Sequence, residues 1–246
     1  MVELLFLVAA FLAEVIGTIA GFGSSTILLP IALFFFDFPT SLVLVAIFHI
    51  SGNIGRATFF KRGFHRKILV NFGIPSILMT VVGALLVAYI PQDLLKFILG
   101  IFLIAFSVFS WRHPDFRFAP TKRNSVIGGA VSGFFAGLIG TGGALRGAFL
   151  NSFKFKKEVY IATAAVIALA VDLTRVPIYI FNGFLREEFY TVIPILFLLA
   201  IMGSYIGKQL VERISQKSFR KIVLLMIIAV SLKFVYDGLL YALGRM

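Results

Sequence analysis

The chain has 246 residues, of which 60% are hydrophobic and only 14% are charged, and its mean hydropathy is +1.01. Soluble domains are about 45–50% apolar and about one quarter charged, so this chain could not cover itself with polar surface and is expected to lie in lipid. The net charge of +12 could suggest nucleic-acid binding, but the basic residues fall between apolar segments and are explained by membrane topology. The absence of cysteine excludes disulfides, thiol catalysis and thiolate metal sites.

Eight apolar stretches, separated by short polar loops, predict helices in a membrane. They cover residues 3–36, 40–60, 68–90, 94–111, 124–151, 159–181, 189–207 and 222–243. A spanning helix needs about 20 residues, and each stretch is long enough or nearly so. The stretches lack the period-2 alternation of an outer-membrane barrel. The expected fold class is therefore an all-α polytopic membrane protein.

The first stretch, residues 3–36, is too long for one spanning helix. A single helix of this length would rise about 51 Å, well beyond a hydrocarbon core of about 30 Å. The segment Gly21-Phe22-Gly23-Ser24-Ser25 lies within it, and we expect two helical pieces that are broken there. The stretch opens with Glu3 and no basic leader, which argues against a cleaved signal peptide.

The second half of the chain repeats features of the first half at an offset of 119 residues. Gly21–Ser24 aligns with Gly140–Gly143, Arg56 aligns with Arg175, and Pro75 aligns with Pro194. An intramembrane arginine and a mid-segment proline at one offset indicate a duplication. We predict a first repeat over residues 1–118 and a second repeat over residues 119–246.

Four loops carry 16 of the 23 Lys and Arg residues. These loops are residues 61–67, 112–123, 152–158 and 208–221. The positive-inside rule places all four in the cytoplasm. The segment 124–151 joins two of these loops, so it must enter the membrane and return to the same side. By the same reasoning, residues 3–36 enter and leave on the outer side, and both chain termini lie outside.

Each repeat is then a re-entrant or broken helix hairpin followed by three transmembrane helices, with the second repeat inverted relative to the first. The first repeat holds the hairpin 3–36 and helices 40–60, 68–90 and 94–111, and the second holds the hairpin 124–151 and helices 159–181, 189–207 and 222–243. Inverted repeats with broken helices are typical of secondary transporters. Eight plain helices in parallel repeats are the alternative, and they would place Lys154, Lys156 and Lys157 outside.

The broken helices predict a binding site near the membrane midplane. Half-helices that begin near Ser24 and Gly143 would direct their N-termini toward it, and such ends favour anions. The predicted substrate-binding residues are Gly23, Ser24, Ser25, Asn53, Arg56, Thr141, Gly142, Gly143 and Arg175. Close helix packing through small residues is the alternative explanation of the glycines. Arg146, in the second hairpin, lies either near this site or near lipid headgroups.

Charged residues inside the apolar segments are the other candidates. Arg56 and Arg175 follow the two hairpins at matching positions, and a guanidinium suits carboxylate, sulfonate or phosphate oxygens. Alternatively, Arg56 snorkels to the nearby loop and Arg175 pairs with Asp172 on its own helix. Asp172, Glu14 and His49 are candidates for proton coupling. Glu14 could instead pair with an arginine, and His49 could be structural.

With these residues in hand, the chain resembles the sulfite exporter TauE/SafE family of membrane permeases. That family carries a glycine-rich stretch near the start of each half, and here the copies read Gly21–Ser25, continuing to Pro30, and Gly140–Ala144. Serines replace two glycines in the first copy, and Phe149 stands where the second copy would have proline. The resemblance implies transport of small sulfur-containing anions such as sulfite, sulfoacetate or related sulfonates.

We therefore expect a secondary transporter in the plasma membrane, not an enzyme, that exports such an anion by alternating access at a midplane site. Its partners would be the anion and the lipid bilayer. A proton or sodium ion is the candidate for coupling, a homo-oligomer is compatible with the sequence, and no cofactor, metal or nucleic acid is expected. The alternatives are an intramembrane serine hydrolase that uses Ser24 and His49, and an anion channel.

Overall fold

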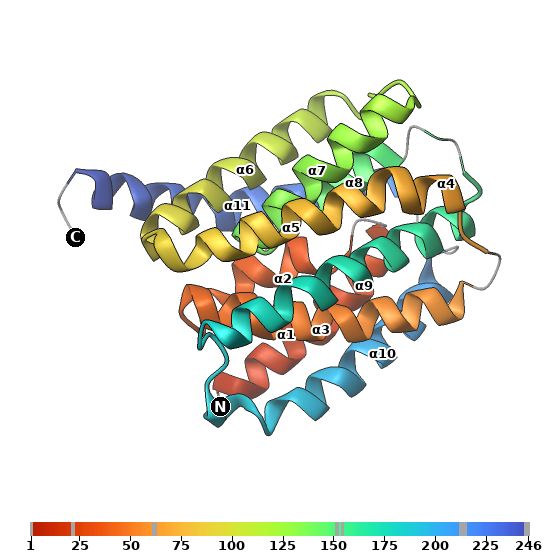
Figure 1. The fold of residues 1–246 in the computed structure, drawn as a ribbon. Helices are drawn as coiled ribbons and strands as arrows, with labels where there is room; N and C mark the ends of the chain where they lie inside the picture. The colour runs from red at the N-terminus through yellow and green to blue at the C-terminus, as the bar shows by residue number, and fades with distance from the viewer. Residues whose placement is uncertain are drawn as a thin grey trace.

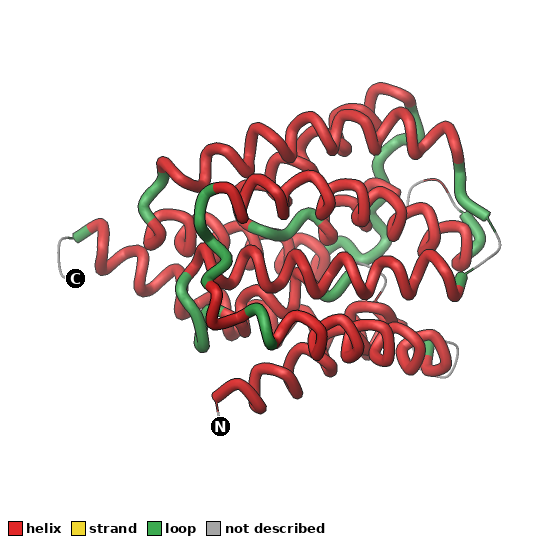
Figure 2. Tube along the Cα trace, turned by 60° about the horizontal axis from the view of Figure 1, so that its bottom comes forward, coloured by secondary structure: helices red, strands yellow, loops and turns green. Residues whose placement is uncertain are grey.

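The computed structural model describes residues 2–20, 23–60, 63–150, 153, 155–211 and 216–243 of the chain. These residues form helices and connecting loops, with no strand among them (Figure 2). Figure 1 shows the helices packed side by side as one bundle, with both chain termini toward its left-hand end. Of the residues named in the sequence analysis, Gly21, Phe22 and Lys154 lie outside the described part.

Within the described residues, six helical stretches are long and apolar enough to cross a membrane. They are Phe38–Phe59 (α3), Arg66–Tyr89, Gln92–Arg112 (α6), Glu158–Phe181 within α9 (Lys157–Phe181), Val192–Leu210 (α10) and Val223–Ala242 within α11 (Gln216–Ala242). The second stretch comprises α4 (Arg66–Ile68), a π-helical turn (Leu69–Gly73), α5 (Ile74–Leu86) and a 3-10 turn (Val87–Tyr89). The all-α polytopic class is confirmed.

Each of the two long glycine-containing segments is a long helix, a break and a helix of eight residues. The first segment contains α1 (Val2–Ala20) and α2 (Ser25–Ala32), and the second contains α7 (Lys122–Ile139) and α8 (Gly143–Leu150). Gly23 and Gly140 adopt φ values of +88° and +73° in the breaks, a region that glycine occupies without steric cost. Each short helix packs against the long helix before it, and α2 contacts α8.

The helices of the two predicted repeats pack in matching pairs. Helix α1 packs against α10, and its counterpart α7 packs against α5, the counterpart of α10. In the same way, the α3–α10 contact in one repeat order corresponds to the α9–α5 contact in the other. The α3–α9 and α6–α11 contacts each join a helix to its own counterpart in the other repeat. Most observed helix ends lie within a few residues of the predicted ones, and α11 begins earlier than predicted, at Gln216. The opposite insertion of the two repeats into the membrane stays a prediction.

Helices α5 and α7 are in direct backbone contact along a stripe of glycines. A Cβ atom added to Gly129, Gly133 or Gly137 would lie 2.2, 2.0 or 2.3 Å from the carbonyl oxygen of Phe72, Ser76 or Thr80, respectively. Two hydroxyl groups of α5 also form hydrogen bonds to the backbone of α7. Ser76 Oγ donates to the Gly129 carbonyl at 2.8 Å, and Thr80 Oγ1 donates to the Gly133 carbonyl at 3.0 Å. Small residues at such spacing let membrane helices approach closely.

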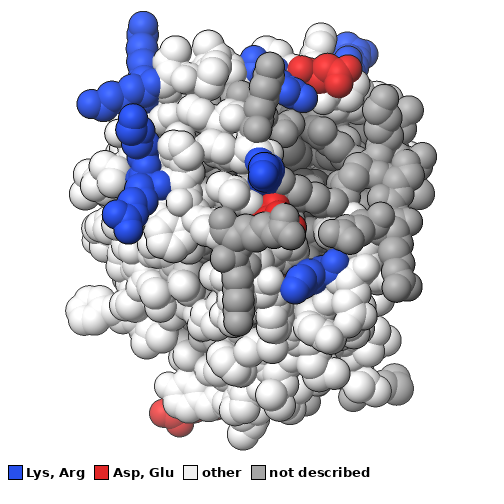
Figure 3. Space-filling view, turned by 90° about the vertical axis from the view of Figure 1, so that its right-hand side faces the viewer, with Lys and Arg blue, Asp and Glu red and all other residues white. Residues whose placement is uncertain are grey.

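The loops that are rich in Lys and Arg share one end of the bundle. The ends of α3, α6 and α10 and the starts of α4, α7 and α9 all lie toward the right-hand end of Figure 1, away from the termini. Figure 3 looks onto that end, where Lys and Arg side chains gather. Their exposed members in the described residues include Arg66, Lys67, Arg112, Arg117, Lys122, Arg123, Lys156 and Lys208.

The glycine stripe predicts a sharp difference between two substitutions on α7. Gly133→Val places a side chain against the backbone of α5 and is expected to destabilise the protein by about 1–3 kcal/mol, the usual effect of overpacking. Val131→Leu, at a position that is 38% exposed on the same helix, is expected to change stability little. Thermal unfolding of the two variants in detergent measures the difference, and equal unfolding temperatures would contradict the proposed contact.

Candidate functional site

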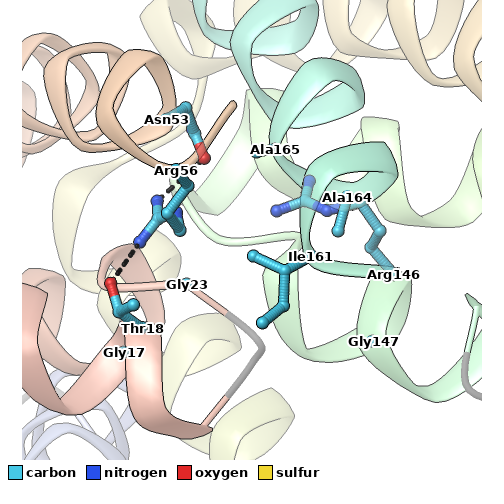
Figure 4. A pocket seen from close by; sticks show the side chains of 10 residues that line it. All are labelled: Gly17, Thr18, Gly23, Asn53, Arg56, Arg146, Gly147, Ile161, Ala164 and Ala165. Atoms are coloured by element: carbon cyan, nitrogen blue, oxygen red, sulfur yellow. Dashed lines mark hydrogen bonds between the residues drawn. The ribbon is translucent and has the colours of Figure 1, made fainter. Parts of the chain in front are cut away.

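A small cavity lies where the break after α1 meets α3, α8 and α9 (Figure 4). It is lined by Gly17, Thr18, Gly23, Asn53, Arg56, Arg146, Gly147, Ile161, Ala164 and Ala165. Its volume of about 20 Å³ is close to what one ordered water molecule requires. A sulfonate or sulfite anion, as expected from the sequence, is larger than a water molecule and would not fit this cavity unless its walls moved apart.

Arg56 reaches the cavity from α3 and is held by two residues of α1 and one residue of its own helix. Its Nη1 donates to Glu14 Oε1 at 2.6 Å and to Thr18 Oγ1 at 3.3 Å, and its Nη2 donates to Asn53 Oδ1 at 2.8 Å. Figure 4 shows the guanidinium between Thr18 and Asn53. Arg56 is only 4% exposed. The side chain is therefore paired inside the bundle and does not snorkel toward the loop.

Glu14 joins three helices through one carboxylate oxygen. Its Oε1 accepts from Arg56 on α3, from Thr18 on its own helix α1, and from Ser204 Oγ on α10 at 2.7 Å. The other oxygen, Oε2, is buried and has no hydrogen-bond partner in the described part of the chain. It lies against α3, where a Cβ added to Gly52 would be 2.5 Å away. Glycine at position 52 is thus what admits the carboxylate.

Asp172 forms the centre of a second buried cluster, between α3 and α9. Its Oδ2 accepts from His49 Nδ1 at 2.8 Å and from Asn53 Nδ2 at 3.2 Å, while its Oδ1 lies 2.9 Å from Arg175 Nε and 2.8 Å from Arg175 Nη2. An ionised carboxylate only accepts hydrogen bonds, so the His49 proton lies on Nδ1. Asn53 links this cluster to Arg56 through its amide oxygen.

Arg175 is neutralised by Asp172 and points to the end of α7. Its Nη1 donates to the Ala136 carbonyl at 2.7 Å, and the Tyr179 hydroxyl donates to the Gly137 carbonyl at 2.5 Å. These carbonyls lie in the last turn of α7, where no following helical residue remains to pair with them. Arg175 does not line the cavity. Its pairing with Asp172 matches one of the two interpretations of the sequence, and its direct binding of substrate stays a prediction.

Arg146 enters the cavity from α8, on the opposite side from Arg56 (Figure 4). It is 5% exposed. Among the described residues, its guanidinium forms no hydrogen bond and no ion pair. The sequence analysis left its place open, because the first hairpin has no basic residue at the aligned position. The signal that could have decided it is the composition of α8, where Arg146 is the one charged residue among small and apolar side chains.

Gly23 lies in the wall of the cavity, close to the side chains of His49 and Arg146. A Cβ atom added to Gly23 would lie 2.8 Å from His49 Nε2 and 3.9 Å from Arg146 Nη2. Ser24 follows as the N-cap residue of α2, makes no side-chain cap hydrogen bond, and has a buried Oγ without a partner in the residues described. His49 Nε2 is likewise buried and unpartnered. The two atoms proposed for a Ser24–His49 dyad are therefore not hydrogen-bonded to each other.

The remaining predicted residues do not line the cavity, and one of them, Thr141, joins the two hairpins. Thr141 Oγ1 lies 2.8 Å from Thr26 Oγ1, which connects the second break to α2. The Gly142 carbonyl accepts from Ser132 Oγ at 2.8 Å, and Gly143 begins α8. Ser25 is buried at the first position of α2. A direct role of these residues in substrate binding stays a prediction.

A buried, charged cavity inside a bundle of membrane-crossing helices is the arrangement of a membrane transporter. The chain belongs to the sulfite exporter TauE/SafE family, whose family model matches residues 6–234. Among curated proteins, the chain is similar to a probable membrane transporter protein of Methanocaldococcus jannaschii, with 25% identity over 241 residues that cover 88% of this chain and 89% of that protein. No solved structure matches the chain.

The buried pair of Glu14 and Arg56 predicts a large effect of removing one partner. Glu14→Ala leaves the Arg56 cation uncompensated and is expected to destabilise the protein by about 3–5 kcal/mol. The double variant Glu14→Ala/Arg56→Met removes both charges and is expected to recover part of that loss. Asp93→Ala is the control, because it breaks a partly exposed pair with Lys96 and should cost about 1 kcal/mol or less.

Thermal unfolding in detergent, with each protein at the same concentration, measures these differences. If Glu14→Ala unfolds at the same temperature as Asp93→Ala, the buried pair does not stabilise the bundle as described.

Proposed function

We propose that this membrane transporter is a secondary carrier that exports small sulfur-containing anions, such as sulfite, sulfoacetate or related sulfonates. The observation that carries the proposal is the buried Arg146 guanidinium, which lines the cavity without a partner among the described residues. An uncompensated buried cation is costly, and a bound anion would compensate it. The family name supports the sulfur oxyanion class.

The groups around the cavity suit a sulfonate or sulfite. Arg146 and Arg56 face the same space, and guanidinium groups bind oxyanions with two parallel N–H donors. Asn53 and the backbone at Gly23 also line it. The free Ser24 hydroxyl at the start of α2 would add a donor once the walls move apart. Arg175 would act indirectly, because it holds Asp172 and the end of α7 in place.

Alternating access would follow from inverted repeats that rock against each other around this site. Support comes from the matching helix pairs of the two halves, α1–α10 with α7–α5 and α3–α10 with α9–α5. The cavity has room for about one water molecule, so binding and release of an anion would require the walls to move apart. The carrier would lie in the plasma membrane, with the basic end of the bundle in the cytoplasm and both termini outside.

Arg146→Ala tests the anion site directly. We expect its flux of radiolabelled sulfite or sulfoacetate in proteoliposomes to fall about 10–100-fold, because one charge-assisted contact of about 1.5–3 kcal/mol is lost. Arg146→Lys keeps the charge without the planar fork and should retain an intermediate flux. Arg123→Ala, which removes an exposed cation from α7, is the matched control and should transport as the unchanged protein does.

Unchanged flux of Arg146→Ala, in vesicles that contain equal amounts of folded protein, would exclude Arg146 from the site. Anion currents far above carrier rates in single-channel recordings would instead assign the protein to channels.

The proposed topology can be mapped because the chain contains no cysteine. Single cysteines placed at the exposed positions Ala119, Lys156 and Glu188 provide three reporters. We expect a membrane-impermeant maleimide added to intact cells to label Glu188→Cys and to leave Ala119→Cys and Lys156→Cys unlabelled until the membrane is permeabilised. Labelling of Lys156→Cys in intact cells would support the arrangement with parallel repeats.

A further inference from the structure

His49 has one ring nitrogen that no contact described above uses. The side chain is buried on α3, and its Nδ1 is fixed by Asp172 at 2.8 Å. Its Nε2 therefore carries a lone pair that has no donor within the described residues. This atom lies against Gly23, which lines the cavity, and any side chain at position 23 would collide with it.

The charged groups around His49 come from several helices. Asp172 contacts it from α9 and is itself paired with Arg175, Arg146 acts on it from α8, and Arg56 lies two turns along its own helix α3. Glu14 on α1 acts on it through Arg56. The neighbouring elements α2 and α10 contribute the uncharged Ser24 and Ser204. His49 is thus the one group of this cluster, in the described residues, whose charge changes near neutral pH when unperturbed.

The charge balance of the cluster limits what it can bind. Three guanidinium groups, on Arg56, Arg146 and Arg175, face two carboxylates, on Glu14 and Asp172, so the cluster carries one net positive charge while His49 is neutral. A bound monoanion would bring the net charge to zero. A bound dianion would leave one uncompensated negative charge in a buried site, which is unfavourable in a low dielectric.

We infer that His49 is a proton-binding group of the anion site, which takes a proton on Nε2 when a dianion binds and releases it when the dianion leaves. This inference rests on the proposed anion site. The proton comes from the water on the side from which the anion enters, adds to the Nε2 lone pair, and returns to water on the other side. Asp172 stays ionised and keeps the Nδ1–H bond. A dianion is then carried with one proton, whereas a monoanion is carried alone.

Two anions of fixed charge separate these cases. Methanesulfonate is a monoanion and sulfoacetate is a dianion throughout the neutral range, whereas sulfite changes its own protonation there and is unsuitable. Binding to the purified full-length protein is measured by calorimetry in buffers with different ionisation enthalpies, which reports the protons taken up. We expect about one proton for each sulfoacetate and about none for each methanesulfonate at a pH where His49 is neutral. Sulfoacetate affinity should fall about tenfold per pH unit in that range.

His49→Asn is the diagnostic variant, since an asparagine amide can still donate to Asp172 but has no titrating nitrogen. We expect its sulfoacetate binding to weaken at least about tenfold at neutral pH, to lose its pH dependence and to take up no proton. His113→Asn, which changes an exposed histidine beyond the end of α6, is the matched control and should keep the proton uptake. Thermal unfolding verifies that both variants are folded.

The outcomes separate this inference from the proposed function. Sulfoacetate binding by the unchanged protein without proton uptake would overturn the role of His49 and leave the anion site standing. Proton uptake that persists in His49→Asn would assign the proton to another group and would also overturn it. If neither anion binds, the proposed function fails, and the inference fails with it.

Discussion

The carbonyl groups left open where α7 ends within the bundle must find hydrogen-bond donors inside the protein, because lipid offers none. Arg175 and Tyr179 of α9 supply them at Ala136 and Gly137. A cation at that position also opposes the negative end of the helix dipole. Arg175 is in turn held by Asp172, so the break in α7 and the buried charge cluster form one structure. The break in the second hairpin is therefore stabilised by α9, whose side chains pair with the open carbonyl groups at the end of α7.

The same cluster ties the two halves together. Asn53 on α3 donates to Asp172 on α9 and accepts from Arg56, which is bound to Glu14 on α1. Every member is buried, and removing any one leaves a charge or a polar group exposed to an apolar interior. The cavity lies beside this chain of contacts. Charged residues that are placed to hold the helices together therefore also determine the electrostatic potential at the cavity.

The sequence predicted the helical architecture well, because length and apolar composition alone decide which segments can cross a membrane. The two breaks also followed from segment length and glycine, and the aligned positions 53 and 172 turned out to be hydrogen-bonded to each other. The orientation of side chains could not be predicted in this way. Arg56 and Arg175 match in sequence, yet Arg56 lines the cavity whereas Arg175 turns to the end of α7. That difference depends on what surrounds each residue in three dimensions.

The two equivalent helix pairs differ in what fills the space between their axes. In the α5–α7 pair the main chains touch, while in the α1–α10 pair Gly203 and Gly207 of α10 receive the side chains of Glu14 and Thr18. The nearest atoms of these two side chains are Cβ atoms, whose positions are set by the backbone of α1. In mechanical terms, α5 and α7 form a strut of touching main chains, whereas α1 and α10 are spaced by two side chains, Glu14 and Thr18, that both contact Arg56.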